Sequence, residues 1–175
     1  MQTIEDLVKD FLDQKVIAVV GVSDHRETGA NLNYKKFKAN GYRVYPVNPR
    51  IRSYAGAACY PDLKSIPEKP GGVFILASPT VTDQIVQECI ELGIKRVWMH
   101  CQMGIRPGLS PTNTSVSQSA AQACRANGVA VIPGSCPAQF LRPDLGHALM
   151  RQLWGLLGYL NASEAGDESP QRSQA

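Results

Sequence analysis

The chain has 175 residues, of which 43% are hydrophobic and 19% charged, and its formal net charge is +3. This is the composition of one globular domain, since domains cluster near ~100–150 residues, and it excludes a wholly disordered chain. The basic residues are scattered, and no apolar run reaches the ~18 residues of a membrane-spanning helix, which argues against nucleic-acid and membrane partners.

The N-terminal segment carries acidic residues and no small-residue cleavage site, so no presequence is apparent and a cytoplasmic protein is predicted. An odd number of cysteines with no C-x-x-C pair argues against a disulfide framework or a zinc ribbon. We therefore expect reduced thiols and no bound metal. The cysteines are Cys59, Cys89, Cys101, Cys124 and Cys136.

Apolar residues in the first fifteen positions recur at helical spacing, behind Thr3 and Asp6 as a capping pair, and predict an amphipathic helix. A continuous apolar run at 16–20 then ends at Gly21, as expected of a strand buried on both faces. The same alternation continues along the chain. Further helices are predicted at 31–40, 80–92 and 115–127, and further strands at 42–47, 73–76, 96–100 and 129–132.

Strands and helices that alternate five times predict an α/β fold, a Rossmann-like doubly wound parallel sheet of about five strands in three αβα layers. Residues 144–160 form a last helix with a leucine stripe, which should pack on the sheet or against a second subunit, so a homodimer through this C-terminal helix is predicted. We assign residues 1–160 to the domain and 161–175, which lack large apolar residues, to a disordered tail.

Parallel sheets bind ligands beyond the carboxyl ends of their strands, so the loops that follow the strands are the candidate site. In the first loop, Gly21-x-Ser23 with Arg26 departs from the dinucleotide-binding G-x-G-x-x-G pattern at two of its three glycines. A tight turn, a hydroxyl and a cation remain, which would suit a phosphate. The alternative is an ordinary strand-to-helix turn.

The second loop indicates which nucleotide would bind. An NAD-binding domain places Asp or Glu at the end of its second strand, whereas this chain has Val47, Asn48, Pro49 and Arg50, with Arg52 close behind. Arginines pair with a phosphorylated ribose, which NADP carries at the 2′ position and coenzyme A (CoA) at the 3′ position. The residue types do not separate the two, and solvated loop charges are the other interpretation.

Four stretches carry a family resemblance: IAVVGVS at 17–23, GYRVYPVNP at 41–49, CYPDLKSIP at 59–67 and GSCP at 134–137. With them the chain resembles the single-domain CoA-binding proteins, which are similar to the N-terminal domain of the succinyl-CoA synthetase alpha subunit. The resemblance implies a Rossmann-like domain with CoA across the strand ends. The residues implied to contact CoA, together with those of the two loops above, are Gly21, Val22, Ser23, Arg26, Val47, Asn48, Pro49, Arg50, Ala77, Ser78, Pro79, Gln102, Gly104 and Cys136.

By position in the resemblance, residues 21–23 would meet the phosphates and residues 48–50 the adenosine end. Residues 77–79 would line the adenine or pantetheine path, and Gln102 with Gly104 would border the pantetheine. We expect binding of CoA or an acyl-CoA without established catalysis. The alternatives are an NADP-dependent oxidoreductase and a CoA-linked regulatory or interaction protein.

One group of side chains suggests nucleophilic chemistry: His100 with Cys101, and Cys136 on the neighbouring strand-end loop. Such cysteines could form a mixed disulfide with CoA. However, adjacent residues on a strand point to opposite faces, so His100 and Cys101 need not meet. No catalytic residue is assigned.

Overall fold

A five-stranded parallel sheet forms the centre of the computed structural model, which describes residues 3–101, 114–143 and 145–156. The strand order is β2-β1-β5-β6-β7, and every neighbouring pair is parallel, as the sequence predicted. The strands are β1 (Val16–Val20), β2 (Arg43–Val47), β5 (Gly72–Ile75), β6 (Arg96–Met99) and β7 (Ala130–Pro133).

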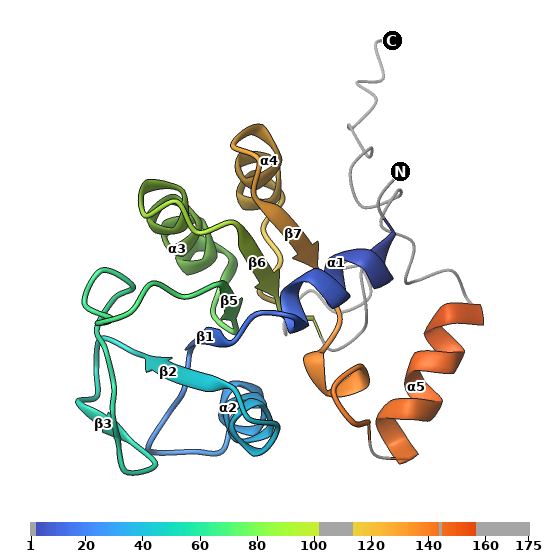
Figure 1. Cartoon of the computed structure of the whole chain (residues 1–175), viewed down its shortest axis with the longest axis horizontal. Helices are drawn as coiled ribbons and strands as arrows, with labels where there is room; N and C mark the ends of the chain where they lie inside the picture. Colours follow the sequence, from blue (N-terminus) through green and yellow to red (C-terminus); the bar gives the residue numbers. More distant parts are fainter. Residues whose placement is uncertain (1–2, 102–113, 144, 157–175) are drawn as a thin grey trace, which may run out of the picture.

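Helices cover both faces of this sheet (Figure 1). On one side lie α1 (Ile4–Leu12) and α2 (Gly29–Ala39), and on the other α3 (Pro79–Glu91) and α4 (Gln118–Ala126). The predicted capping pair is present, because the Thr3 hydroxyl accepts from the Asp6 amide and the Asp6 carboxylate accepts from the Thr3 amide. The doubly wound, three-layer αβα fold is therefore confirmed.

The strands are buried on both faces, as their continuous apolar runs predicted. In β1, Ile17 and Val19 belong to the core cluster under α1 and α2, whereas Ala18 and Val20 belong to the cluster under α3 and α4. Side chains alternate between the faces of a strand, so a strand in the middle of three layers needs apolar residues at every position.

Helix α1 packs against the sheet through Phe11. A Cβ atom on Gly72 of β5 would lie 2.7 Å from the Phe11 ring, so the absence of a side chain there makes room for the phenylalanine. The Phe11 ring also meets Trp98 of β6 edge-on, with ring centroids 5.3 Å apart. Arg96 at the start of β6 bonds Asp10 of α1 at 2.7 Å.

Two short elements were not predicted. A hairpin of β3 (Ser53–Tyr54) and β4 (Ala57–Ala58) turns through Ala55 and Gly56, both at positive φ. A 3-10 turn, η2 (Pro137–Gln139), follows β7.

The last described helix, α5 (Leu145–Leu156), keeps its leucine stripe in solvent. Leu145, Leu149, Leu153 and Leu156 are 92%, 69%, 50% and 86% exposed, so the alternative that this stripe packs on the sheet is wrong. Figure 1 shows α5, which follows η2 in the chain, beside the rest of the fold. The predicted end of this helix at residue 160 and the predicted tail at 161–175 lie outside the described residues.

Candidate functional site

The strand order reverses between β1 and β5. From β1 the chain moves outward to β2 in one direction and, through β5, to β6 and β7 in the other. In doubly wound sheets this reversal opens a crevice beyond the carboxyl ends of the two central strands, where ligands bind. We call this side of the molecule the carboxyl edge, meaning the loops at 21–28, 48–52, 76–78, 100–101 and 134–136.

Gly21 is the first residue after β1, and the local backbone geometry explains why this position holds a glycine. Its φ is +99°, and a Cβ atom there would lie 1.9 Å from the carbonyl oxygen of Leu76 on the neighbouring β5 loop. Its amide donates to the Val47 carbonyl at 3.0 Å. The glycine therefore lets two strand ends approach each other, and its amide is already bonded.

Asn31 organises the rest of this turn from inside α2. The side chain is 2% exposed, and its Oδ1 accepts hydrogen bonds from the Ser23 amide and the Thr28 hydroxyl, both at 2.8 Å. Its Nδ2 donates to the carbonyls of Ser23 at 2.7 Å and Arg26 at 3.2 Å. The sequence interpretation did not assign these hydrogen bonds to Asn31. The available signal was an asparagine three residues after a threonine N-cap, within a helix where asparagine is a poor helix former.

Asn48 joins the first loop to the second. Its Nδ2 donates to the Val22 carbonyl at 2.6 Å, and its Oδ1 accepts from the Arg50 amide at 2.8 Å. The two loops that the sequence singled out are therefore held together by one side chain, which also fixes the backbone of Arg50.

Two predicted contact residues have side chains that face inward. Val22 is 0% and Val47 1% exposed, and each belongs to one of the two core clusters. Their side chains stabilise the loops by packing, so only their backbone atoms lie at the carboxyl edge.

The loops of the carboxyl edge carry three arginines and two acidic residues, Asp24 and Glu27. Arg26, Arg50 and Arg52 are exposed, and none has an ion-pair partner within the part of the chain that the structure describes. By contrast, nearby Lys35 pairs with Glu27 at 2.8 Å. The Thr28 hydroxyl accepts from the Asn31 amide and caps α2, whose first turn opens at the same edge.

The loop after β5 contributes residues 77–79. The Ala77 amide donates to the hydroxyl of Ser115 at 3.0 Å, so it is bonded within the chain. Ser78 is exposed and is the N-cap of α3, and Pro79 occupies the first helical position. The Ser78 side chain makes no capping hydrogen bond. That hydroxyl therefore faces solvent at the crevice.

The side chains of His100 and Cys101 lie on opposite faces of the sheet, as strand geometry predicted. The His100 ring meets Phe74 edge-on at 5.9 Å between centroids, on the α1–α2 face, whereas Cys101 is fully buried in the cluster under α3 and α4. Burial lowers the pKa of the His100 imidazole to about 4, so the ring is neutral at pH 7. Cys136 lies 3.7 Å from Nδ2 of Asn33 on α2. The structure therefore does not bring His100 and Cys101 together as a nucleophile and its base.

Gln102 and Gly104, predicted to border the pantetheine, lie outside the described residues. Within the described ranges, no three His, Cys, Asp or Glu side chains gather as metal ligands. None of the described helices is long and apolar enough to cross a bilayer.

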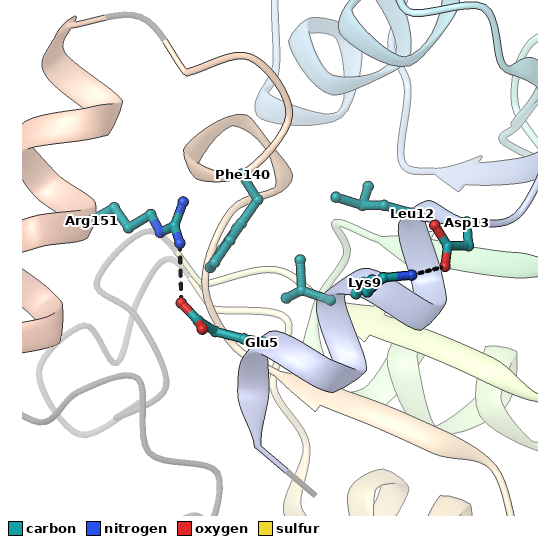
Figure 2. Close-up of a pocket in the computed structure, with 7 residues that line it drawn as sticks. Glu5, Lys9, Leu12, Asp13, Phe140 and Arg151 are labelled. Atoms are coloured by element: carbon teal, nitrogen blue, oxygen red, sulfur yellow. Dashed lines mark hydrogen bonds and ion pairs between the residues drawn. The ribbon is translucent and has the colours of Figure 1, made fainter.

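A separate cavity of about 370 Å³ lies between α1, η2 and α5. Figure 2 shows two ion pairs among its lining residues: Arg151 with Glu5 at 3.0 Å, beside the ring of Phe140, and Lys9 with Asp13 at 2.6 Å, near Leu12. None of the predicted contact residues lines this cavity, so it is distinct from the carboxyl edge.

Taken together, these features define a doubly wound α/β domain with a cationic carboxyl edge, an architecture in which nucleotides commonly bind. A more specific assignment comes from comparison with known proteins. Residues 15–141 match the CoA binding domain family, and the chain belongs to it. The resemblance seen in the sequence is thus confirmed.

Curated relatives include acetate–CoA ligase (ADP-forming) II of Archaeoglobus fulgidus, 32% identical over 96 residues, which are 53% of this chain and 14% of that enzyme. The alpha subunit of the Pyrococcus furiosus ligase is 33% identical over 91 residues, which are 50% of this chain and 19% of the subunit. The chain thus spans less than a fifth of the length of each of these relatives.

Solved structures share the fold. A hypothetical protein from Pyrococcus horikoshii OT3 is 30% identical with a TM-score of 0.67, covering 80% of this chain and 92% of that one. The dinucleotide-forming acetyl-coenzyme A synthetase 1 of Ca. Korarchaeum cryptofilum has a TM-score of 0.58 at 19% identity, covering 71% of this chain and 27% of that enzyme.

Proposed function

We propose that this chain binds CoA or an acyl-CoA at its carboxyl edge, with no established catalytic activity. The observation that carries this proposal is the set of three exposed arginines without an ion-pair partner in the described structure: Arg26, Arg50 and Arg52. CoA presents a diphosphate and a 3′-phosphate, and guanidinium groups pair with phosphate oxygens through two parallel hydrogen bonds. Membership of the CoA binding domain family supports the same ligand.

Each part of CoA has a candidate partner in this arrangement. Arg26 and the first turn of α2 would hold the diphosphate, and Arg50 the 3′-phosphate. Residues 77–79 would line the path of the adenine or pantetheine. Gln102, Gly104 and Cys136 remain predictions for the pantetheine side.

NADP is the second candidate, since the same arginines suit a 2′-phosphate. Membership of the CoA binding domain family favours CoA, and the first turn departs from the fingerprint typical of dinucleotide-binding domains. In the dinucleotide fingerprint a glycine backbone approaches the pyrophosphate, whereas here the amides of Gly21 and Ser23 are bonded to Val47 and Asn31.

A thermal-shift comparison of CoA, acetyl-CoA, dephospho-CoA, NADP and NAD tests the ligand. A ligand at about 100 times its dissociation constant stabilises the folded state by about 2.7 kcal/mol. We expect a rise in Tm with CoA and none with NAD or NADP. A rise with NADP alone would favour the oxidoreductase, and no rise with any ligand would leave a regulatory or interaction protein.

Arg50→Ala tests the contact with the ribose phosphate in the same assay. The variant should bind CoA about tenfold more weakly, the order of one charge-assisted hydrogen bond, while dephospho-CoA binding changes little. Arg125→Ala is the matched control, an exposed arginine at the C-terminal end of α4, and should bind both ligands as wild type does. Equal losses for CoA and dephospho-CoA in Arg50→Ala would contradict the assignment.

We further propose that residues 1–160 form the ligand-binding domain and that the protein is cytoplasmic. Cys59, Cys89, Cys101 and Cys124 are buried thiols without disulfides, which suits a reducing compartment.

We propose a homodimer through α5. Its four exposed leucines are spaced so that they lie on one face of the helix, and α5 contains no acidic residue. Its described cation, Arg151, is held over the Phe140 ring and bonded to Glu5 of the same chain. Two copies can therefore bring their leucine faces together without placing like charges in the contact.

The dimer is tested by sedimentation of Leu149→Glu. A carboxylate in the middle of the leucine face should make the protein monomeric at concentrations where wild type is a dimer, because it would be desolvated without a partner. Leu32→Glu is the control, since Leu32 is 59% exposed on α2 and away from this face. A wild-type protein that remains monomeric at high concentration would contradict the proposal.

A further inference from the structure

Asn31 belongs to α2, yet its side chain bonds mainly to the loop that precedes this helix. Its carboxamide makes four hydrogen bonds, and three of them reach outside the helix to backbone groups, namely the amide and carbonyl of Ser23 and the carbonyl of Arg26. The fourth comes from the hydroxyl of the N-cap, Thr28. Asparagine is a poor helix former, so this position trades helix propensity for control of the loop.

The Val22–Ser23 segment is held from two sides as a result. Asn48 bonds the carbonyl of Val22 at 2.6 Å, and Asn31 bonds both backbone groups of Ser23. The loop then runs through His25, whose amide donates to the Ser23 hydroxyl at 3.2 Å, to Arg26, whose carbonyl Asn31 also holds. No other side chain within the described residues bonds the backbone of Arg26.

We propose that Asn31 is a positioning residue for the ligand. Its buried carboxamide fixes residues 23–28 before the ligand arrives and so holds Arg26 where it meets a phosphate. This inference rests on the proposed function, because the group that Arg26 meets is a phosphate of CoA. Pre-organisation of this kind raises affinity by reducing the ordering that binding would otherwise require.

Asn31→Ala is the test, with Asn40→Ala as the matched control. Asn40 lies at the opposite end of the same helix, and its side chain donates one hydrogen bond, to the Lys36 carbonyl, without contacting the loop. Two measurements are made on each variant: hydrogen exchange of the ligand-free protein, and binding of CoA, dephospho-CoA and pantetheine by calorimetry. Alanine is neutral, so the substitution places no new charge near the phosphates.

In the ligand-free protein, Asn31→Ala should speed amide exchange at residues 23–28 while β1 and β2 stay protected. CoA and dephospho-CoA should bind about tenfold more weakly, as expected if the loop holds its binding conformation about a tenth of the time. Pantetheine, which lacks the phosphates, should bind the variant and wild type alike. Asn40→Ala should match wild type in both measurements.

Two results would overturn the proposal. One is unchanged exchange at 23–28 in Asn31→Ala, which would mean that the loop holds its shape without the carboxamide. The other is increased exchange with CoA affinity equal to wild type. If the wild-type protein binds no CoA, the proposed function is contradicted, and with it the role of Asn31 in ligand binding. The exchange measurement still shows whether Asn31 orders the loop.

Discussion

Gly21 shows that a glycine in a motif position can be required by the protein's own backbone. Sequence interpretation linked it to a phosphate, because the first glycine of a dinucleotide fingerprint stands there. In the structure its missing side chain accommodates the Leu76 carbonyl, and its left-handed φ directs the chain into the turn. The residue thus sets the distance between the β1 and β5 loops that flank the crevice.

Gly21→Ala should therefore destabilise the fold by about 3 kcal/mol or more, since backbone strain at positive φ adds to a collision with a carbonyl group. Gly41→Ala is the control: Gly41 also has a positive φ, +84°, but nothing lies within 4 Å of its Cβ position. It should lose only about 1 kcal/mol. Urea unfolding measures both, and equal losses would contradict the role of Leu76.

His100 makes stability depend on pH in a defined window. Its pKa is lowered from 6.5 to about 4 by burial, so protonation favours the unfolded state as the pH falls below 6.5. Between pH 7 and pH 5 this should cost about 2 kcal/mol, at about 1.4 kcal/mol per pH unit. The pKa values of the Asp62 and Glu68 carboxyls are lowered from 3.8 and 4.5, so these groups stay ionised there.

His100→Gln should reduce this acid loss, as measured by urea unfolding at pH 7, 6 and 5. The matched control is His25→Gln, because His25 is exposed in the first loop. An unchanged pH dependence in His100→Gln would show that the imidazole does not titrate differently in the folded protein.

At the scale of elements, the sequence predicted the five α-helices and the five central strands of the described part of the chain, and the ends that can be compared differ by only a few residues. Long apolar periodicities carry that information. The β3–β4 hairpin was not predicted because its strands are two residues long and its turn, Ala55-Gly56, lacks the Asn-Gly or Asp-Gly signal of such turns.

The sequence indicated which loops form the candidate site, but much less which side chains and backbone groups face it. Topology alone places the strand-end loops together at one edge. Side-chain direction and hydrogen bonding are settled by packing, which a linear pattern does not encode. Val22, in the first loop, and Val47, at the end of β2, therefore face the core. Asn31, inside a helix, organises a turn that begins ten residues earlier.

At the scale of the whole molecule, the carboxyl edge and the α5 region are separate. The arginines and the crevice belong to the loops after the strands, whereas the leucine face and the cavity near Phe140 belong to α1, η2 and α5. The proposed ligand binding and the proposed self-association should therefore respond to different substitutions, namely those at the arginines and those at the leucine face.

The packing of α1 has a practical consequence. The family match begins at residue 15, after this helix has ended, yet Phe11 fills the space over Gly72 and meets the ring of Trp98. A protein trimmed to the family boundaries would turn that aromatic surface toward water and invite aggregation. In this chain the residues matched by the family are thus fewer than those that build the core, and truncation should spare residues 3–14.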